Sequence, residues 1–298
     1  MNLLVTGAWG SAKEHIAELE NMGHRVSFLQ QEKEALPVPY EWVEGIIGNG
    51  IFLYHSIEKF SHLRYIQLTS AGFDRVPMDY VTKMNIEIKN AAGVYSIPMA
   101  EFAVAGVLSL YKQMRFFTHN QASHRWEKHR GLLELSGKTV CIIGCGSVGN
   151  ECAKRFSAFG CRVLGIKRHP HVHDAYENIF SLDRLNDVLR ESDVVVLTVP
   201  LTEETHHMMD TERLALLKDT AVLVNIARGA VVDTDALETV LNRIGGAVLD
   251  VFEEEPLPQN SPLWDAENVI LTPHNSFVGE GNQRRLSNLI FNHLEVIS

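Results

Sequence analysis

The sequence has little cysteine, and its few thiols are crowded into one short stretch. Only four of the 298 residues are cysteine. They are Cys141, Cys145, Cys152 and Cys161, and no two of them have C-x-x-C spacing. Such a cluster is a poor disulfide framework, so we expect buried or half-buried thiols and a reducing, cytoplasmic location.

The sequence also has fewer basic than acidic residues. Lys and Arg number 27 against 37 Asp and Glu, which gives a formal net charge of −10. A protein that binds nucleic acid usually carries a basic surplus, so this balance points away from a nucleic-acid partner.

Long apolar runs are missing as well. No stretch approaches the roughly 18 apolar residues of a membrane span, so we expect no membrane partner. The N-terminal segment Met1-Asn-Leu-Leu-Val lacks the basic region of a signal peptide and is typical of a first β-strand.

Short apolar runs alternate with helical patterns along both halves of the chain. This rhythm predicts an α/β fold with doubly wound parallel sheets, and the length suits two domains of roughly 100–200 residues. The expected strands are 3–6, 26–29, 45–47, 65–68 and 86–88, and then 139–143, 162–166, 194–199, 221–226, 247–251 and 269–271. The expected helices are 12–22, 98–114, 147–159, 183–190, 211–217 and 234–243.

The longest expected helix lies in the middle of the chain. Ser96 is placed to cap it and Pro98 suits its first turn. From Met99 to Met114 the pattern is apolar nearly all round, which is typical of a helix buried between two domains or two subunits. The polar stretch 119–137 that follows is expected to be a linker.

A glycine motif follows the first strand of the second half. Gly144, Gly146 and Gly149 form G-x-G-x-x-G between an apolar strand and a helical pattern. In a dinucleotide-binding loop these glycines allow a tight turn, a close approach to a pyrophosphate and close packing of helix on strand. The pyrophosphate would then lie at the helix N-terminus, against the backbone of Ser147 and Val148.

The acid that usually follows the next strand is absent. NAD-preferring enzymes have Asp or Glu there to bind the ribose 2′-hydroxyl, whereas this chain has Lys167 and Arg168. Two cations attract a 2′-phosphate, so the sequence favours NADP(H). The alternative is that both are solvated surface charges and that NAD(H) is bound without the acid. We expect no metal site at His169, His171 and His173, which suit the rim of the adenosine pocket.

These features belong to a longer series of motifs. In chain order they are Ser70-Ala-Gly72 with Asp74, Asn90-Ala-Ala-Gly93, Ala100-Glu-Phe102, Gly144-Cys-Gly-Ser-Val-Gly149, Val199-Pro-Leu-Thr202 with Thr205, Asn225-Ile-Ala-Arg-Gly229 with Asp233, Leu249-Asp-Val-Phe-Glu-Glu-Glu-Pro256 and Leu271-Thr-Pro-His274. In joint order and spacing, over nearly the whole chain, they resemble the D-isomer-specific 2-hydroxyacid dehydrogenases, of the glyoxylate/hydroxypyruvate reductase kind.

The resemblance implies two Rossmann-like domains with a cleft between them. Residues 1–95 and 276–298 would form a flavodoxin-like substrate-binding domain, and residues 96–275 the dinucleotide-binding Rossmann domain. The C-terminal residues should form a helix that returns to the first domain. Its apolar stripe would consist of Leu286, Leu289, Ile290 and Leu294. Together with the apolar central helix, the resemblance also implies a homodimer.

The resemblance places the catalytic arginine, glutamate and histidine on Arg228, Glu255 and His274. An imidazolium can protonate the oxygen of a carbonyl that accepts a hydride, and a neighbouring carboxylate favours its charged form. An arginine can hold the substrate carboxylate through paired donors. Glu253 and Glu254 compete for the glutamate role, and the adjacency to a proline selects Glu255.

The remaining site residues are also implied by the resemblance. The cofactor pocket would include Val199, Pro200, Thr205, Ile226, Ala227 and Asp250, with Arg228 and His274 shared with catalysis. Asp250 is expected to meet the nicotinamide carboxamide. The backbone N–H groups of Ala71 and Gly72 would hold the substrate carboxylate. Asn49 and Gly50 form either a second substrate loop or a plain turn.

The leading hypothesis is an oxidoreductase that reduces a small 2-oxo acid such as glyoxylate, hydroxypyruvate or a branched 2-oxo acid. One alternative in the same class is a phosphoglycerate dehydrogenase, for which no extra phosphate-binding cations are evident. Another is a nucleotide-sensing protein similar to the corepressors that share this fold. A methyltransferase would account for the glycine loop but not for the later arginine, glutamate and histidine motifs.

Overall fold

The structure, a computed structural model, describes residues 1–297 and divides into two compact units. Unit 1 comprises Met1–Tyr95 and the C-terminal segment that begins at Gly279, and unit 2 comprises Ser96–Val278. The chain thus passes from unit 1 into unit 2 and back again. The substrate-binding and dinucleotide-binding roles of the two units stay predictions at this point.

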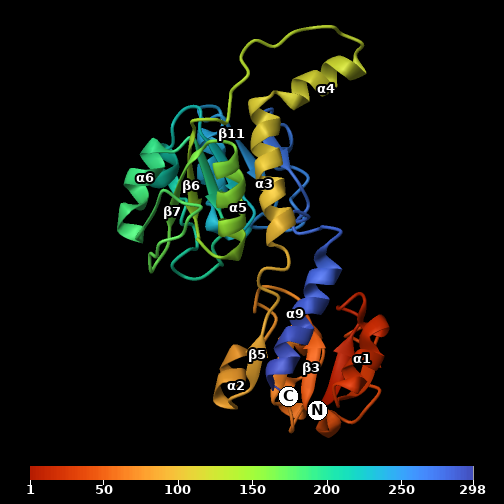
Figure 1. Cartoon of the computed structure of the whole chain (residues 1–298). Coiled ribbons are helices and arrows are strands. Elements are labelled where there is room, and N and C mark those ends of the chain that lie inside the picture. The colour runs from red at the N-terminus through yellow and green to blue at the C-terminus, as the bar shows by residue number, and fades with distance from the viewer. Residues whose placement is uncertain (298) are drawn as a thin grey trace. The chain divides into compact units, whose positions relative to one another are not determined.

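Unit 1 is built on a five-stranded parallel sheet in the order β2-β1-β3-β4-β5 (Figure 1). The strands are β1 (Asn2–Thr6), β2 (Arg25–Leu29), β3 (Gly45–Gly48), β4 (Tyr65–Leu68) and β5 (Glu87–Lys89). Its helices are α1 (Ile16–Asn21), α2 (Met78–Lys83) and α9 (Asn282–Ile297). This strand order is that of flavodoxin-like doubly wound sheets, so the predicted fold class is confirmed for this unit.

The two faces of this sheet bury different residues because side chains alternate along each strand. Leu4, Ile46 and Ile66 face one core, whereas Leu3 and Ile47 face the other. The second core also contains Leu286, Ile290 and Leu294 of α9, with Leu289 partly buried against it. The predicted apolar stripe of the C-terminal helix is therefore confirmed.

Unit 2 is built on a seven-stranded parallel sheet in the order β12-β11-β10-β9-β6-β7-β8. The strands are β6 (Thr139–Ile143), β7 (Arg162–Ile166), β8 (Asn178–Phe180), β9 (Val194–Leu197), β10 (Val222–Asn225), β11 (Gly246–Leu249) and β12 (Val269–Leu271). The helices are α3 (Ser96–Tyr111), α4 (Met114–Ala122), α5 (Ser147–Ala158), α6 (Leu185–Glu191), α7 (Thr211–Ala215) and α8 (Thr234–Val240). The five inner strands are almost wholly buried and nearly continuous in apolar residues, as parallel sheets covered on both faces require.

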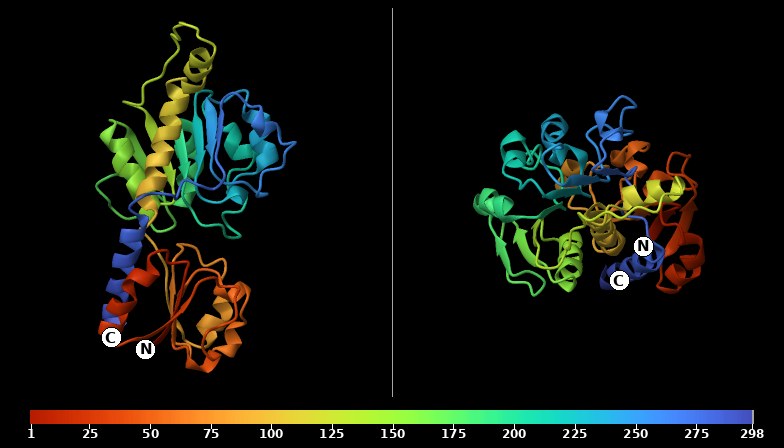
Figure 2. Two further views of the ribbon diagram at one scale, coloured as in Figure 1. Left: turned by 90° about the vertical axis from the view of Figure 1, so that its right-hand side faces the viewer. Right: turned by 90° about the horizontal axis from the view of Figure 1, so that it is seen from above.

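Helices cover both faces of this second sheet (Figure 2). Val140 and Ile142 of β6 share a core with residues of α3 and α5. Cys141 and Ile143 of the same strand share the opposite core with residues of α6, α7 and α8. Because all seven strands are parallel, their carboxyl ends meet at one edge of the sheet. Ligands bind at this edge in open α/β sheets.

Three local expectations are wrong. Ser96 does not cap the central helix: it is the first residue of α3, and its buried Oγ has no hydrogen-bond partner among residues 1–297. The single helix 98–114 is broken at Gln113, whose φ of 53° is incompatible with a continuous helix. A second helix, α4, therefore occupies the start of the predicted linker, as far as Ala122. The short edge strand β8 was not expected at all.

The four thiols are free, as the sequence predicts. Cys141, Cys145 and Cys152 are buried and Cys161 is half-buried. Burial raises the pKa of Cys152 to about 12 and that of Cys161 to about 11. Within the described residues no helix is both long enough and apolar enough to cross a bilayer.

Candidate active site

The glycine motif forms the turn between β6 and α5. Gly144 has a φ of +103°, which only glycine adopts readily, and its backbone lies close to that of Thr198. A Cβ at Gly149 would lie 2.2 Å from the Gly144 carbonyl oxygen, so α5 packs against the turn as closely as two backbones allow. The Thr198 hydroxyl donates to that same oxygen at 2.6 Å and fixes the turn.

The middle glycine of the motif faces open space. A Cβ at Gly146 would meet no atom of residues 1–297 within 4 Å. Gly146 is also the N-cap of α5, and no described side chain caps the helix there. The backbone of Ser147 and Val148 at this helix end therefore offers N–H donors to a ligand, together with the positive end of the helix dipole. These residues fit a pyrophosphate in the manner that the motif predicts.

Three predicted site residues follow neighbouring strands at the carboxyl edge of the sheet. Arg228 follows β10, Asp250 follows β11 and His274 follows β12. The three strands are adjacent and in register, with Leu249 paired to both Asn225 and Leu271. The sheet thus brings residues that are far apart in the sequence to one edge of unit 2.

His274 and Glu255 form a hydrogen-bonded pair. The Nδ1 atom of His274 lies 2.9 Å from Oε2 of Glu255, and both side chains are partly exposed. The other carboxylate oxygen of Glu255 accepts from the backbone N–H of Phe252 at 3.1 Å, which fixes the carboxylate to its own loop. His274 itself has a φ of 51°, and its N–H donates to the Asp250 carbonyl at 2.8 Å. The imidazole is therefore held by a strained backbone and an oriented carboxylate.

The competing acid Glu253 is paired with a different histidine. Its Oε1 lies 2.5 Å from Nε2 of His207, and its Oε2 accepts from the N–H of Thr234 at 3.0 Å. Burial alone would raise the pKa of Glu253, but the hydrogen bonds from Thr234 and His207 outweigh it and lower the pKa. The geometry therefore selects Glu255 over Glu253 as the partner of His274. His207 was not among the predicted site residues, because no local motif marks it.

Arg228 lies in a loop that its neighbours hold tightly. The Asn225 side chain donates to the Arg228 carbonyl at 3.0 Å and accepts from the Ala227 N–H at 3.1 Å. The guanidinium donates to the Ala227 carbonyl at 2.7 Å. A Cβ at Gly229 would lie 1.8 Å from the carbonyl carbon of Phe252, so only glycine lets this loop approach the loop of Glu255.

Asp250 is buried at the end of β11, among hydrogen-bond donors from the loop after β12. It is 1% exposed, and its carboxylate accepts from the Thr272 hydroxyl at 2.6 Å and from the N–H groups of Asn275 at 2.7 Å and Ser276 at 2.9 Å. The predicted contact with a nicotinamide carboxamide stays a prediction. A buried carboxylate needs such donors, and here they come from the loop that carries His274.

The other predicted pocket residues divide into buried and exposed ones. Ile226 and Ala227 are 1% and 6% exposed and pack into the two cores, so they present backbone more than side chain to the edge of the sheet. Thr205 is also buried. Its hydroxyl donates to the Pro200 carbonyl at 2.7 Å and thereby shapes the loop in which Val199 is half-buried and Pro200 exposed.

The two predicted cofactor cations lie just past β7. Arg168 forms an ion pair with Glu204, and both side chains are largely exposed. The Lys167 ammonium lies 3.4 Å from Nδ1 of His171. Among residues 1–297, no three His, Cys, Asp or Glu side chains gather in an arrangement suited to a metal ion.

The predicted substrate loops lie in unit 1. The N–H groups of Asn49 and Gly50 both donate at 2.7 Å to the carboxylate of Glu32, a residue that the sequence analysis did not single out. The loop of Ala71 and Gly72 is largely open to solvent. Its Ala71 carbonyl accepts from the Asn90 side chain at 2.7 Å.

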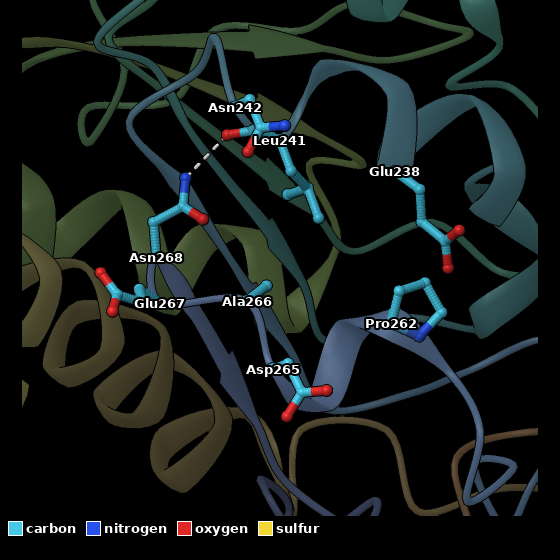
Figure 3. A pocket seen from close by; sticks show the side chains of 8 residues that line it. All are labelled: Glu238, Leu241, Asn242, Pro262, Asp265, Ala266, Glu267 and Asn268. Carbon is cyan, nitrogen blue, oxygen red and sulfur yellow. Dashed lines mark hydrogen bonds between the residues drawn. The ribbon is translucent and has the colours of Figure 1, made fainter.

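A separate cavity of unit 2 does not suit a dinucleotide. It has a volume of about 620 Å³ and lies between the end of α8 and the segment before β12 (Figure 3). Glu238, Asp265 and Glu267 line it. These acids would repel a pyrophosphate, and the cavity lies at the start of β12, away from the carboxyl edge that carries His274.

Comparison with known proteins gives the family. The family model described as D-isomer specific 2-hydroxyacid dehydrogenase, NAD binding domain, matches residues 104–276. A glyoxylate reductase of Thermofilum pendens is 39% identical over 222 residues, which are 72% of this chain and 65% of that protein. A glyoxylate reductase of Pyrococcus horikoshii is 38% identical over 243 residues, 78% of this chain and 72% of that protein.

A solved structure extends the likeness to the whole chain. It is a D-isomer specific 2-hydroxyacid dehydrogenase from Xanthobacter autotrophicus, in complex with NADPH and MES. It is 28% identical with a TM-score of 0.78, and the match covers 97% of this chain and 93% of that one. The chain therefore belongs to the D-isomer specific 2-hydroxyacid dehydrogenases. It is an NAD(P)-dependent oxidoreductase that interconverts 2-oxo and 2-hydroxy acids.

The close approach at Gly229 gives a testable expectation. Gly229→Ala would drive a methyl group into the backbone at Phe252, so both loops must move. We expect the free energy of unfolding to fall by about 1–3 kcal/mol, as is usual for overpacking, and activity to fall with it. Thermal melts should show this loss. Gly131→Ala should melt like the wild type, because a Cβ at this exposed glycine would meet only the movable side chain of His129. Equal melting of the two variants would contradict the close approach.

Proposed function

We propose that this enzyme reduces a small 2-oxo acid of the glyoxylate or hydroxypyruvate kind to the D-2-hydroxy acid, with NADPH as the preferred cofactor. The observation that carries the proposal is the His274–Glu255 pair, at the same sheet edge as Arg228 and the glycine turn. A bound reduced nicotinamide supplies the hydride that adds to the 2-oxo carbon.

His274 is the proposed general acid. Because its Nδ1 is turned toward Glu255, Nε2 is the nitrogen that can give a proton to the carbonyl oxygen as negative charge develops there. The Glu255 carboxylate stabilises the imidazolium and fixes the orientation of the ring. In the reverse direction the neutral imidazole takes the proton of the substrate hydroxyl through the same nitrogen.

Arg228 is the proposed anchor of the substrate carboxylate. A guanidinium can hold a carboxylate through two parallel hydrogen bonds, which fixes the direction of the neighbouring 2-oxo group. The hydrogen bond from the Asn225 side chain and the close approach at Gly229 limit the freedom of the Arg228 backbone. Orientation of this kind accounts for a large part of the rate in a bimolecular hydride transfer. The backbone N–H groups of Ala71 and Gly72 are the proposed second contact of the carboxylate.

NADP(H) is the proposed cofactor because Lys167 and Arg168 follow β7 where NAD-preferring enzymes have an acid. The Xanthobacter autotrophicus relative holds NADPH, which supports the same choice. Cellular NADP pools are usually kept reduced, so the proposed direction is reduction of the 2-oxo acid.

Substitution of His274 tests the proposed chemistry. We expect His274→Ala to lower kcat for glyoxylate about 10²–10⁴-fold, the usual effect of losing a general acid, while cofactor binding persists. Arg228→Gln should raise KM as well as lower kcat, because it removes a ground-state contact. His119→Ala, which changes an exposed histidine on α4 of unit 2, is the matched control and should behave as wild type. Full activity of His274→Ala would rule out its role as the general acid.

A wild type that binds NADPH but reduces no member of a broad 2-oxo acid panel would favour a sensing protein.

Cofactor preference is tested by steady-state kinetics with a fixed 2-oxo acid. We expect kcat/KM to be higher with NADPH than with NADH. Lys167→Ala should lower the NADPH value about tenfold, the effect of one charge-assisted hydrogen bond, and leave the NADH value nearly unchanged. Equal values for the two cofactors, or a preference for NADH, would refute the choice of NADP(H).

A homodimer is the proposed assembly. Trp126, in the segment after α4, is 99% exposed, and Leu132 in the same segment is 40% exposed. A fully exposed tryptophan is uncommon on a monomer and typical of an interface. We expect light scattering to give about twice the chain mass of 33.4 kDa, and Trp126→Glu to shift the mass toward the monomer. A wild-type mass near 33.4 kDa would contradict the dimer.

A further inference from the structure

An ion pair joins two loops on either side of the glycine turn. Arg168 follows β7, and Glu204 lies in the segment between β9 and α7. The guanidinium and the carboxylate are in direct contact, although the side chains are 60% and 63% exposed. Arg168 is one of the two predicted cofactor cations, whereas Glu204 is not among the predicted site residues.

The topology places this pair beside the candidate cofactor turn. Strands β7 and β9 flank β6 in the sheet (β6 and β7 are seen in Figure 1). Ile143 at the end of β6 pairs with Ile166 of β7 on one side and with Leu197 of β9 on the other. The glycine turn leaves the end of β6. An ion pair between the loops that follow β7 and β9 therefore spans the end of β6, on the side where a dinucleotide would place its adenosine ribose.

We propose that Glu204 is a cofactor-specificity residue, which supplies from a distant loop the acid that is missing after β7. This proposal rests on the proposed function, because it assumes a nicotinamide dinucleotide on the glycine turn. With NAD(H), the Glu204 carboxylate accepts a hydrogen bond from the ribose 2′-hydroxyl while Arg168 holds the carboxylate in place. With NADP(H), the 2′-phosphate binds Arg168 in place of Glu204. The negative charges of the phosphate and of the Glu204 carboxylate then repel one another.

The exposure of the pair makes this exchange easy. Exposed ion pairs contribute little to stability, so Arg168 can leave Glu204 at small cost. A dianionic phosphate is a stronger partner for a guanidinium than a carboxylate is, because it offers more charge and more acceptor oxygens. Lys167 adds a second cation on the same side, with His171 as its nearest described partner. We infer that the chain binds both cofactors and prefers NADPH. Glu204 limits the difference between the two affinities.

The test is direct binding of each cofactor, measured by fluorescence titration without substrate. Glu204→Gln removes the charge and keeps the shape. We expect it to tighten NADPH binding about three- to tenfold by removing a like charge, and to weaken NADH binding about two- to fivefold by replacing a charged acceptor with a neutral one. The opposite shifts of the two dissociation constants distinguish specificity from a general change of the loop.

Two further variants are needed to interpret that result. Glu203→Gln is the matched control, since it removes the same charge one residue away and should leave the ratio of the two constants within about twofold. Arg168→Gln should weaken NADPH binding about tenfold or more and NADH binding much less. In the Arg168→Gln background, Glu204→Gln should still weaken NADH binding.

The outcomes separate this proposal from the proposed function. If the wild type binds both cofactors and Glu204→Gln changes their ratio no more than Glu203→Gln does, Glu204 is not a specificity residue although the cofactor site stands. Weakening of both cofactors by Glu204→Gln would likewise overturn the proposal and assign the residue a structural role. If the wild type binds neither cofactor, the proposed function fails and this proposal fails with it.

Discussion

A single buried carboxylate holds the active edge of unit 2 together. Asp250 is 1% exposed, and a charge in that position is costly unless donors surround it. Its donors are the Thr272 hydroxyl and the N–H groups of Asn275 and Ser276, which lie on both sides of His274. The segment after β12 is thus wrapped around a charge at the end of β11. The unusual backbone conformation of His274 is a consequence of that wrapping, because the surrounding bonds over-determine it.

The same edge depends on backbones that approach without side chains between them. Gly229 lies against Phe252, and Gly149 lies against the carbonyl of Gly144. The first contact ties the loop after β10 to the loop after β11, and the second closes the turn between β6 and α5, so the predicted site residues are carried on short, braced turns. Rigid support of this kind is what holds catalytic groups in place without each needing its own helix.

The fold could be predicted from the sequence because its signals are local. Apolar strands of four or five residues, glycines at fixed spacing and the stripe on α9 are read along the chain, and the glycine turn and the pairing of His274 with Glu255 lie where the motifs place them. What could not be predicted depends on contacts between distant segments. Glu32, Glu204 and His207 have no motif, since each acts on a loop far away in the sequence. The donors that surround Asp250 could not be predicted for the same reason, because they come together only in the folded sheet.

The order of strands in the larger sheet has a further consequence. Its two outer strands, β12 and β8, have only three residues each, shorter than any strand between them. An outer strand exposes unpaired N–H and C=O groups, and a short one offers few of them to another chain. The sheet is therefore a poor template for growth by strand addition. Any self-association of this unit must be mediated by side chains on its helices and loops rather than by extension of its hydrogen-bonded ladder.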